Sequence, residues 1–460
     1  MMILLSIFFL QFTDKVGAER VCLSPTAMEM REARGIAIDS LDYEVSPIYL
    51  DSVQALGATV LHTSRWMNGA TVQASEEVIG AIAKCEFVES VEKTRGDEEM
   101  RLLGDEEMRL LGDEAGEQLD QLNLLPLHQA GYKGRGIRIG VADGGFYNAN
   151  TLLSLPQSQC LGYADLTDDE EDIFGASGSH GTMCLSAIVA KQDAYMGAAT
   201  EAEYYLFRTE EEYTESKKEI DNWVAAIEMA DSLGLHIVST SLGYTTFDDA
   251  QMNFQYADMD GRTSRGAQAA VIAARKGMLL VVAAGNDGNK DWHYLSTPAD
   301  ADSVLTVGAV DVDKNIAAFS SFGPSADGRV KPEVCAMGKR TQLIHPQDNC
   351  ITHSNGTSFA CPLVAGMAAC LWSALPEASN MEIRERIIRS ADRYTAPHEQ
   401  YGYGIPDAWM AYTQTTTAIP SMQMKEPSPA RKFIQNGQLY ILYNDEIYNL
   451  LGILVFSERR

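Results

Sequence analysis

The sequence is poor in basic residues, with 36 Lys and Arg against 64 Asp and Glu and a formal net charge of −28. A surface that binds nucleic acid needs a basic footprint, so this balance argues against DNA and RNA as partners. It suits a protein that stays soluble in a cation-rich or extracellular medium. The 460 residues, 45% of them hydrophobic, are enough for one large core and smaller modules.

The chain has no Cys-x-x-Cys pair, and its eight cysteines are scattered. This spacing argues against a zinc ribbon. Cys361 and Cys370 lie in a long apolar run, where we expect buried thiols. Cys335 and Cys350 could close a surface loop in an oxidising compartment, but pairing cannot be read from sequence and stays open here.

Metal-binding patterns are equally scarce. Asp258 and Asp260 precede Gly261 and hint at calcium, but the spacing of a helix-loop-helix calcium site is missing. Acidic loops of this kind are usually only solvated. We therefore predict no metal site and no required cofactor, and leave a structural calcium ion as an open alternative.

Long hydrophobic runs are also few. Residues 3–10 are apolar, and Val16, Gly17 and Ala18 follow as small residues, so we predict a secretory leader over residues 1–18 that lacks a basic start. The alternative is a disordered or buried N-terminal strand. We find no other run long enough for a membrane helix. The expected location is secreted, cell-surface or periplasmic.

Residues 19–95 read as a small α+β module. Helices are expected at 47–57 and 75–83, and strands at 59–65, 69–74 and 87–92. A tandem repeat follows at 96–117: the octapeptide Gly-Asp-Glu-Glu-Met-Arg-Leu-Leu occurs twice, and a decayed copy begins at residue 112. Its acidic, Gly-interrupted composition predicts an exposed tether that proteases can cut.

Short apolar strands alternate with helices from 118 to 412, which is typical of a mostly parallel sheet covered on both faces. Asp143 stands at the C-terminal end of a strand at 136–142, and Asn286 ends another at 278–286. Such strand ends are where open α/β sheets place their sites. His180 begins an apolar helix, and Ser358 lies at the start of another, where unpaired N–H groups favour negative charge.

Taken singly, each of these residues has a plainer explanation. Asp143 and Asn286 could form turns, His180 could be a capping or core histidine, and Ser358 could only cap its helix. Their combination, in the order Asp, His, Asn, Ser, favours a catalytic site.

Five stretches carry a resemblance to a known family. They are Ile-Gly-Val-Ala-Asp-Gly-Gly at 139–145, His-Gly-Thr at 180–182, Ser-Leu-Gly at 241–243, Ala-Gly-Asn at 284–286 and Gly-Thr-Ser-Phe-Ala-Cys-Pro at 356–362. The chain resembles the subtilisin-like serine peptidases, and the order of the motifs distinguishes that family from other serine hydrolases. The resemblance covers roughly two-thirds of the chain.

The resemblance implies a subtilisin-like fold and a role for each residue. Ser358 would be the nucleophile, His180 the general base and then acid, and Asp143 the residue that orients the imidazole. The side chain of Asn286 and the backbone N–H of Ser358 would form the oxyanion hole. Ser241, Leu242 and Gly243 would pair with the backbone of a polypeptide substrate as an added strand.

One position departs from the family pattern. The family usually has Ser or Thr after the catalytic Asp, and Gly144 stands there. The missing hydroxyl removes a hydrogen bond and no proton carrier, so we expect reduced rigidity without loss of activity.

The resemblance extends to the flanking regions. The module at 19–95 is similar to the family's inhibitory propeptides, and the repeat lies where an activating cut would fall. After a linker at 413–430, two alternating runs at 437–443 and 447–452 predict a β-hairpin within 431–460, similar to C-terminal sorting tails of Bacteroidetes.

The sequence thus predicts a secreted serine endopeptidase made as an autoprocessed zymogen. The alternative is a non-catalytic relative that kept the fold as a binding or processing module. All four site residues are present, which favours the enzyme.

Overall fold

The computed structural model describes residues 5–95, 116–167, 172–175, 178–192, 194–211 and 214–414, and the strands between 431 and 457. The chain divides into two units, 1–412 and 413–460. Most of the predicted repeat and of the predicted linker lies outside the described residues.

The N-terminal module is a four-stranded antiparallel sheet in the order β2-β3-β1-β4. Its strands are β1 (Ser6–Phe12), β2 (Thr59–Ser64), β3 (Gly69–Ala74) and β4 (Val88–Arg95). Its helices are α1 (Pro25–Ala33), the short η1 (Ser40–Asp42), α2 (Pro47–Ala55) and α3 (Glu76–Ile82). Serine side chains cap α1, α2 and α3, which explains where these helices begin. The helices and strands predicted between residues 47 and 92 are confirmed.

For Ser6–Phe12 the structure corrects the predicted leader. These residues form β1, an inner strand of the sheet, and pair with both β3 and β4. Phe8, Leu10 and Phe12 lie in the core of the module, while Phe9 packs into a core shared with the peptidase region. Both faces of the strand are buried from Ile7 to Leu10, and these four residues are all apolar. The buried-strand alternative is the one that the structure supports.

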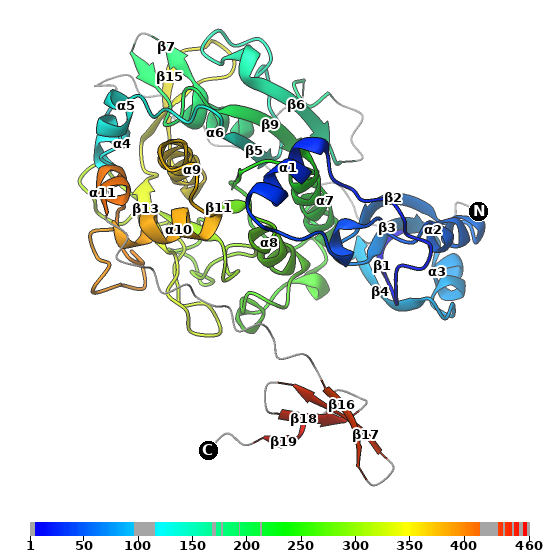
Figure 1. The fold of residues 1–460 in the computed structure, drawn as a ribbon. Coiled ribbons are helices and arrows are strands. Elements are labelled where there is room, and N and C mark those ends of the chain that lie inside the picture. Colours follow the sequence, from blue (N-terminus) through cyan, green and yellow to red (C-terminus); the bar gives the residue numbers. More distant parts are fainter. Residues whose placement is uncertain are drawn as a thin grey trace. The chain divides into compact units, whose positions relative to one another are not determined.

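The larger region is built on a seven-stranded parallel sheet in the order β13-β12-β11-β10-β5-β9-β6 (Figure 1). The strands are β5 (Arg138–Asp143), β6 (Cys160–Asp165), β9 (Glu203–Arg208), β10 (Ile237–Thr240), β11 (Leu279–Ala283), β12 (Leu305–Val310) and β13 (Val334–Met337). This confirms the predicted α/β class.

Helices cover both faces of this sheet. α6 (His180–Val189) and α9 (Thr357–Ala374) share one core with Val281 of β11, while α7 (Lys217–Leu233) and α8 (Arg265–Arg275) share the other with Leu280 and Val282. Alternate residues of one strand therefore point into opposite cores. Smaller elements are α4 (Glu117–Gln121), α5 (Leu125–Gln129), α10 (Asn380–Arg389), α11 (Ala408–Thr413) and the hairpins β7 (Lys191–Gln192)–β8 (Tyr195–Met196) and β14 (Thr341–Ile344)–β15 (Ile351–Ser354).

α9 is long and apolar enough to cross a bilayer, but 89% of it is buried inside the protein, as expected for a core helix. Among the described residues it is the single helix with that length and composition.

The C-terminal unit contains β16 (Arg431–Gln435), β17 (Gln438–Tyr443), β18 (Glu446–Asn449) and β19 (Leu454–Ser457). The pairing of Tyr443 with Glu446 confirms the predicted hairpin around residues 444–445. The sheet is larger than predicted, because β16 and β19 extend it to four antiparallel strands.

Candidate active site

Three adjacent parallel strands bring the predicted residues to one edge of the sheet. Asp143 is the last residue of β5, Ser241 follows β10, and Asn286 follows β11. His180 is the first residue of α6 and Ser358 the second of α9, and these two helices pack against each other. The carboxyl edge of the sheet and two helix N-termini thus converge.

Asp143 and His180 are directly paired. The Nδ1 atom of His180 lies 2.8 Å and 3.1 Å from the two carboxylate oxygens of Asp143. The N–H of Gly144 also donates to the Asp143 carboxylate, at 2.9 Å. Asp143 is buried, whereas the imidazole is one-third exposed and can be reached by a substrate.

This pairing sets the charge of the imidazole. Burial alone would lower the pKa of His180, but the negative charge of Asp143 and its hydrogen bond, with a smaller effect of Cys184, hold that pKa well above the usual 6.5. The pairing therefore stabilises the protonated imidazole, the form that a general base becomes after it has taken a proton.

Ser358 lies next to this pair without a hydrogen bond to it. Its Oγ donates to the carbonyl oxygen of Ser241 at 3.4 Å, and Ser241 Oγ donates to the Ser358 carbonyl at 2.7 Å. The contacts of the described residues include no hydrogen bond between Ser358 Oγ and His180. Such bonds are often loose before substrate binds, and the 3.4 Å contact leaves the hydroxyl free to turn.

Cys184 joins the two helices and was missed by sequence reasoning. Its Sγ lies 3.8 Å from His180 Nδ1 and 3.4 Å from the Ser358 carbonyl oxygen. The spacing of four from His180 on a helix was the available signal, because residues four apart share a face. The ligand atoms of Asp143, His180 and Cys184 lie within 4.8 Å of one another. A metal there would have to displace the Asp143–His180 hydrogen bond.

Asn286 is oriented by Thr357, which sequence reasoning also missed. The Asn286 Oδ1 atom accepts from the N–H of Thr357 at 2.9 Å and from its hydroxyl at 3.0 Å. Thr357 is fully buried, and Asn286 is exposed. With the oxygen held inward, the amide NH₂ has no partner among the described residues and faces the open edge, where it can donate to a negative oxygen.

The Ser241–Gly243 segment has an open backbone edge. Tyr244 pairs with Thr297 beyond it, but the backbone groups of Leu242 and Gly243 make no hydrogen bond to the described part of the chain. Gly243 is exposed and approaches Ser296 so closely that a Cβ would lie 2.0 Å from its hydroxyl. Such an edge can add an extended peptide as a strand.

Glu210 lies beside Gly144, the position at which the sequence departs from the family pattern. A Cβ at Gly144 would lie 3.6 Å from the Cβ of Glu210, an ordinary contact, so a side chain there would fit. The Glu210 carboxylate accepts from Tyr244 at 2.7 Å and from Thr209 at 2.8 Å. Burial, with the charge of Glu215 next in importance, raises the pKa of Glu210 to about 8. A carboxyl group that exchanges its proton near neutral pH thus adjoins the site.

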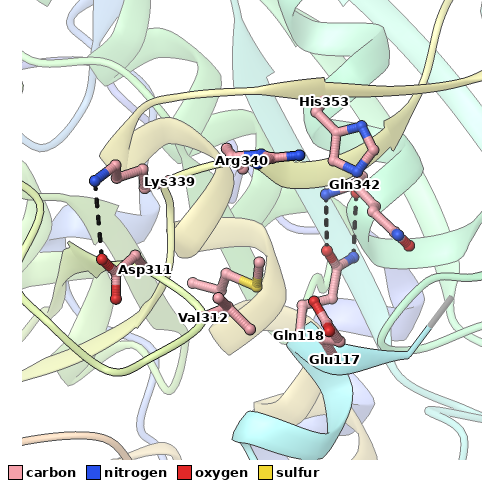
Figure 2. Close-up of a pocket in the computed structure, with 9 residues that line it drawn as sticks. Glu117, Gln118, Asp311, Val312, Lys339, Arg340, Gln342 and His353 are labelled. Carbon is pink, nitrogen blue, oxygen red and sulfur yellow. Dashed lines mark hydrogen bonds and ion pairs between the residues drawn. The ribbon is translucent and has the colours of Figure 1, made fainter. Parts of the chain in front are cut away.

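A cavity of about 340 Å³ lies elsewhere, between the start of the peptidase region and the β14–β15 hairpin (Figure 2). Paired hydrogen bonds of 2.9 and 3.1 Å join Gln118 to the backbone of Gln342 at its rim, and Lys339 faces Asp311 (Figure 2). None of the predicted site residues lines it. The cavity is therefore separate from the candidate site.

Two minor predictions can be compared with the structure. Cys361 and Cys370 are fully buried, as predicted, while Cys335 is buried, Cys350 is exposed and both are free thiols, so the suggested bridge is absent. The Asp260 carboxylate accepts from the N–H groups of Arg262 and Thr263, both at 2.8 Å, within a local turn. This turn accounts for the acidic pattern near Gly261, and calcium binding stays an untested alternative.

Residues 134–404, more than half of the chain, match the sequence profile of the subtilase family. The chain belongs to the subtilase family. Residues 8–104 match the propeptide domain of peptidase S8 from Bacteroidota, so this subtilase carries the predicted propeptide module. That match includes residues 8–12 of β1, in agreement with the corrected position of this segment. The predicted family and enzyme class, a subtilisin-like serine peptidase, are confirmed.

Individual relatives agree. This subtilase is 31% identical to subtilisin DY of Bacillus licheniformis over 264 residues, which cover 57% of this chain and 85% of that protein. It is 26% identical to subtilisin E of Bacillus subtilis over 361 residues, covering 77% and 83%. The match to the subtilisin-like protease SBT6.1 of Arabidopsis thaliana, 26% over 313 residues, spans 63% of this chain but only 28% of that much longer protein.

The fold also matches a solved structure, that of MycP1 from the ESX-1 type VII secretion system. The TM-score is 0.53 at 20% identity, with 69% of this chain and 91% of that chain covered. At this identity the match concerns the fold alone.

Proposed function

We propose that this subtilase hydrolyses peptide bonds through Ser358, His180 and Asp143, with an acyl-enzyme intermediate. The observation that carries the proposal is the buried Asp143 carboxylate held 2.8 Å from His180, beside the helix N-terminus that bears Ser358. The alternative, a non-catalytic binding module, would have no need of a buried carboxylate paired with a reachable imidazole.

The chemistry would begin when a polypeptide pairs with Leu242 and Gly243 and its carbonyl carbon comes within reach of Ser358. The Ser358 hydroxyl turns away from the Ser241 carbonyl, His180 takes its proton, and Oγ attacks the carbonyl carbon. The charge of Asp143 stabilises the imidazolium that results. The negative oxygen of the tetrahedral intermediate accepts from the Ser358 N–H and from the Asn286 amide.

The intermediate then collapses. The imidazolium gives its proton to the leaving amine, and the acyl group stays on Ser358. Water, deprotonated by His180, attacks the ester and releases the second product, which restores the hydroxyl. None of these steps uses a cofactor, and we propose that none is required.

We further propose that the enzyme is made as a zymogen and acts outside the cytoplasm, as a secreted, cell-surface or periplasmic protein. β4 ends at Arg95, which lies 4.0 Å from Glu211 and thus one residue from Glu210 beside the site. A propeptide strand that reaches this point can cover the cleft. Activation would cut the tether between residues 94 and 118, and the C-terminal unit would serve as a sorting tail.

The test is Ser358→Ala in the full chain. We expect a loss of hydrolysis of an unfolded test protein by roughly a millionfold, the scale known for a subtilisin that lacks its nucleophile. Intact mass should show the parent cut within 94–118 and the variant full-length. Ser373→Ala, a serine of the same helix whose Oγ bonds to the Cys370 carbonyl, is the matched control and should cleave and mature normally. Parental activity in the Ser358→Ala variant would refute the assignment.

A further inference from the structure

The turn that follows Asp143 has little rigidity of its own. Gly144 and Gly145 come directly after the aspartate, and two successive glycines leave the backbone unusually free before folding. The turn nevertheless carries the N–H of Gly144, which donates to the Asp143 carboxylate at 2.9 Å. A shift of the turn would therefore move the carboxylate that holds His180, so the turn needs a restraint from outside.

The start of α6 holds one side of this turn. The Thr182 hydroxyl donates to the Tyr147 carbonyl at 2.8 Å. Gly181 approaches so closely that a Cβ there would lie 2.4 Å from the Gly145 carbonyl oxygen. Because the same helix begins with His180, a movement of the turn would disturb both members of the Asp–His pair.

Arg208, the last residue of β9, holds the other side. Its Nε donates to the Gly144 carbonyl at 3.2 Å, and its Nη1 lies 3.2 Å from Oδ2 of Asp165. β9 lies between β5 and β6 (Figure 1), and Asp143, Arg208 and Asp165 are in register across the three strands. The guanidinium therefore ties the turn after Asp143 to the end of β6.

The full burial of the Arg208 side chain calls for an explanation. It is 1% exposed, and arginine is rarely buried to this degree unless it is paired. Its partner Asp165 is 27% exposed, and an ion pair returns only part of the free energy lost when a guanidinium leaves water. A well-packed apolar residue often serves stability equally well. A buried cation at this strand end therefore points to a role in the site.

We propose that Arg208 is a positioning residue for the Asp143–His180 pair. Its guanidinium fixes the Gly144 carbonyl, and through it the turn, and so supplies the restraint that a hydroxyl side chain at residue 144 would otherwise give. Arg208 acts through Gly144 and does not touch the substrate. Its expected effect on hydrolysis rests on the proposed function, whereas its expected effect on the titration of His180 does not.

The variant that tests this role is Arg208→Lys. Lysine keeps the positive charge but has no planar fork, so it cannot hold the same two acceptors in the same geometry. Keeping the charge matters, because loss of a nearby cation would by itself raise the pKa of His180, whereas a loosened contact with Asp143 lowers that pKa. Cys184, the other titratable group beside the imidazole, is unchanged in every variant.

The first measurement is the titration of His180 by NMR in the full chain with Ser358→Ala, where His180→Asn identifies the resonance. We expect Arg208→Lys to move the midpoint to lower pH. Asp165→Glu keeps its charge at a partly exposed position but displaces the carboxylate, and it should move the midpoint the same way by less, even if Arg208→Lys fails to fold. An unmoved midpoint in the variants that fold would overturn the proposal. Because Ser358 is replaced, this result is independent of the identity of the nucleophile.

The second measurement is hydrolysis of a peptide by the matured enzyme. Arg208→Lys should lower kcat about tenfold with little change in KM, because a displaced base affects the reacting step more than binding. Arg386→Lys is the matched control, since Arg386 is 9% exposed and donates to the Ala411 carbonyl in the packing of α10 on α11. It should lower stability but leave kcat within about twofold. Equal losses of kcat in the two lysine variants would reduce Arg208 to a structural role and overturn the proposal.

A side chain at residue 144 gives the sharpest test. The backbone of Gly144 has no positive φ, and a Cβ there would make only an ordinary contact of 3.6 Å with Glu210. Gly144→Ser stiffens the turn from within, so it should raise the kcat of Arg208→Lys about threefold or more and raise that of the parent much less. Effects that are simply additive would show that Arg208 does not act through residue 144. Hydrolysis that persists in Ser358→Ala would refute the proposed function alone and leave the titration result standing.

Discussion

Polar groups at the two edges of the central sheet are used in opposite ways. At the carboxyl edge the Asn286 amide NH₂ and the backbone of Leu242 have no partner among the described residues, and the Ser358 hydroxyl has only a long hydrogen bond. At the amino edge Asp231 and Glu228 are filled by propeptide donors and buried. Groups left open are available to a passing substrate, while filled ones suit a partner that stays. Substitutions in either set of groups should lower the stability of the folded protein. Only substitutions at the open carboxyl edge should change the rate of hydrolysis.

The largest expected effect that sharpens this contrast is that of Asp143→Asn. An amide cannot hold His180 in the tautomer that accepts the serine proton, so kcat should fall roughly 10⁴-fold. The pH profile gives a second readout. A base must be neutral, and the pKa of His180 is raised, so parental kcat/KM should increase with pH through a midpoint above 6.5.

In the Asp143→Asn variant the charge that raises the His180 pKa is gone, and burial lowers it. The midpoint of the residual activity should therefore move to lower pH. Asp231→Asn in α7, where Arg31 and Arg65 of the propeptide module contact the carboxylate, is the matched carboxylate replacement, and it should leave the midpoint of the matured enzyme unchanged. If the midpoint does not move in the Asp143→Asn variant, the pH dependence of hydrolysis does not report the pKa of His180, and His180 is not the general base.

A smaller effect is expected from Asn286→Ala. Loss of a side-chain oxyanion donor should reduce kcat by roughly 100- to 1000-fold with little change in KM, as for this donor in a subtilisin. The split between kcat and KM is decisive, because a structural asparagine would disturb both. Asn286→Asp keeps the size but places a negative charge beside the oxyanion, and it should be at least as damaging.

The smallest of these effects should come from Thr357→Val. The N–H of residue 357 still holds Asn286 Oδ1 at 2.9 Å, but the hydroxyl contacts with Asn286 Oδ1 and with the N–H and carbonyl oxygen of Gly285 are lost. The share of this loss that acts directly on Asn286 is one neutral hydrogen bond of about 1 kcal/mol, so kcat should fall about fivefold. Thr357→Ser retains the hydroxyl and should restore most of the rate. Equal activity of the Val and Ser variants would show that the backbone alone orients Asn286.

The site residues could be predicted because each carries a local signal. Asp143 ends an apolar strand and Asn286 follows another, while His180 and Ser358 lie at the starts of apolar helices, so the parallel topology alone brings them to one edge. What could not be predicted depends on packing between distant segments. The contacts of Cys184 with Ser358 and of Thr357 with Asn286 join residues 71 or more positions apart.

The wrong prediction for residues 6–12 has a physical cause. A strand with one solvated face alternates between apolar and polar residues, whereas β1 is covered on both faces. Phe8 and Leu10 face the module's own helices, whereas Phe9 lies in the core shared with α7. The guanidinium carbon of Arg265 lies over the Phe9 ring, 4.4 Å from the ring centre. A short unbroken apolar run at the start of a chain is also the composition of a leader, so sequence alone could not separate the two.

The two-sided burial of β1 has a consequence for biosynthesis. Because β1 precedes its partners β3 and β4 in the chain, the module can complete its sheet while the peptidase region is still being made. The face that carries Phe9, Trp66 and Met67 then remains uncovered until α7 has emerged from the ribosome. We expect the nascent chain to be most prone to aggregate during this interval. The same uncovered apolar face can also act as a template against which α7 packs as it folds.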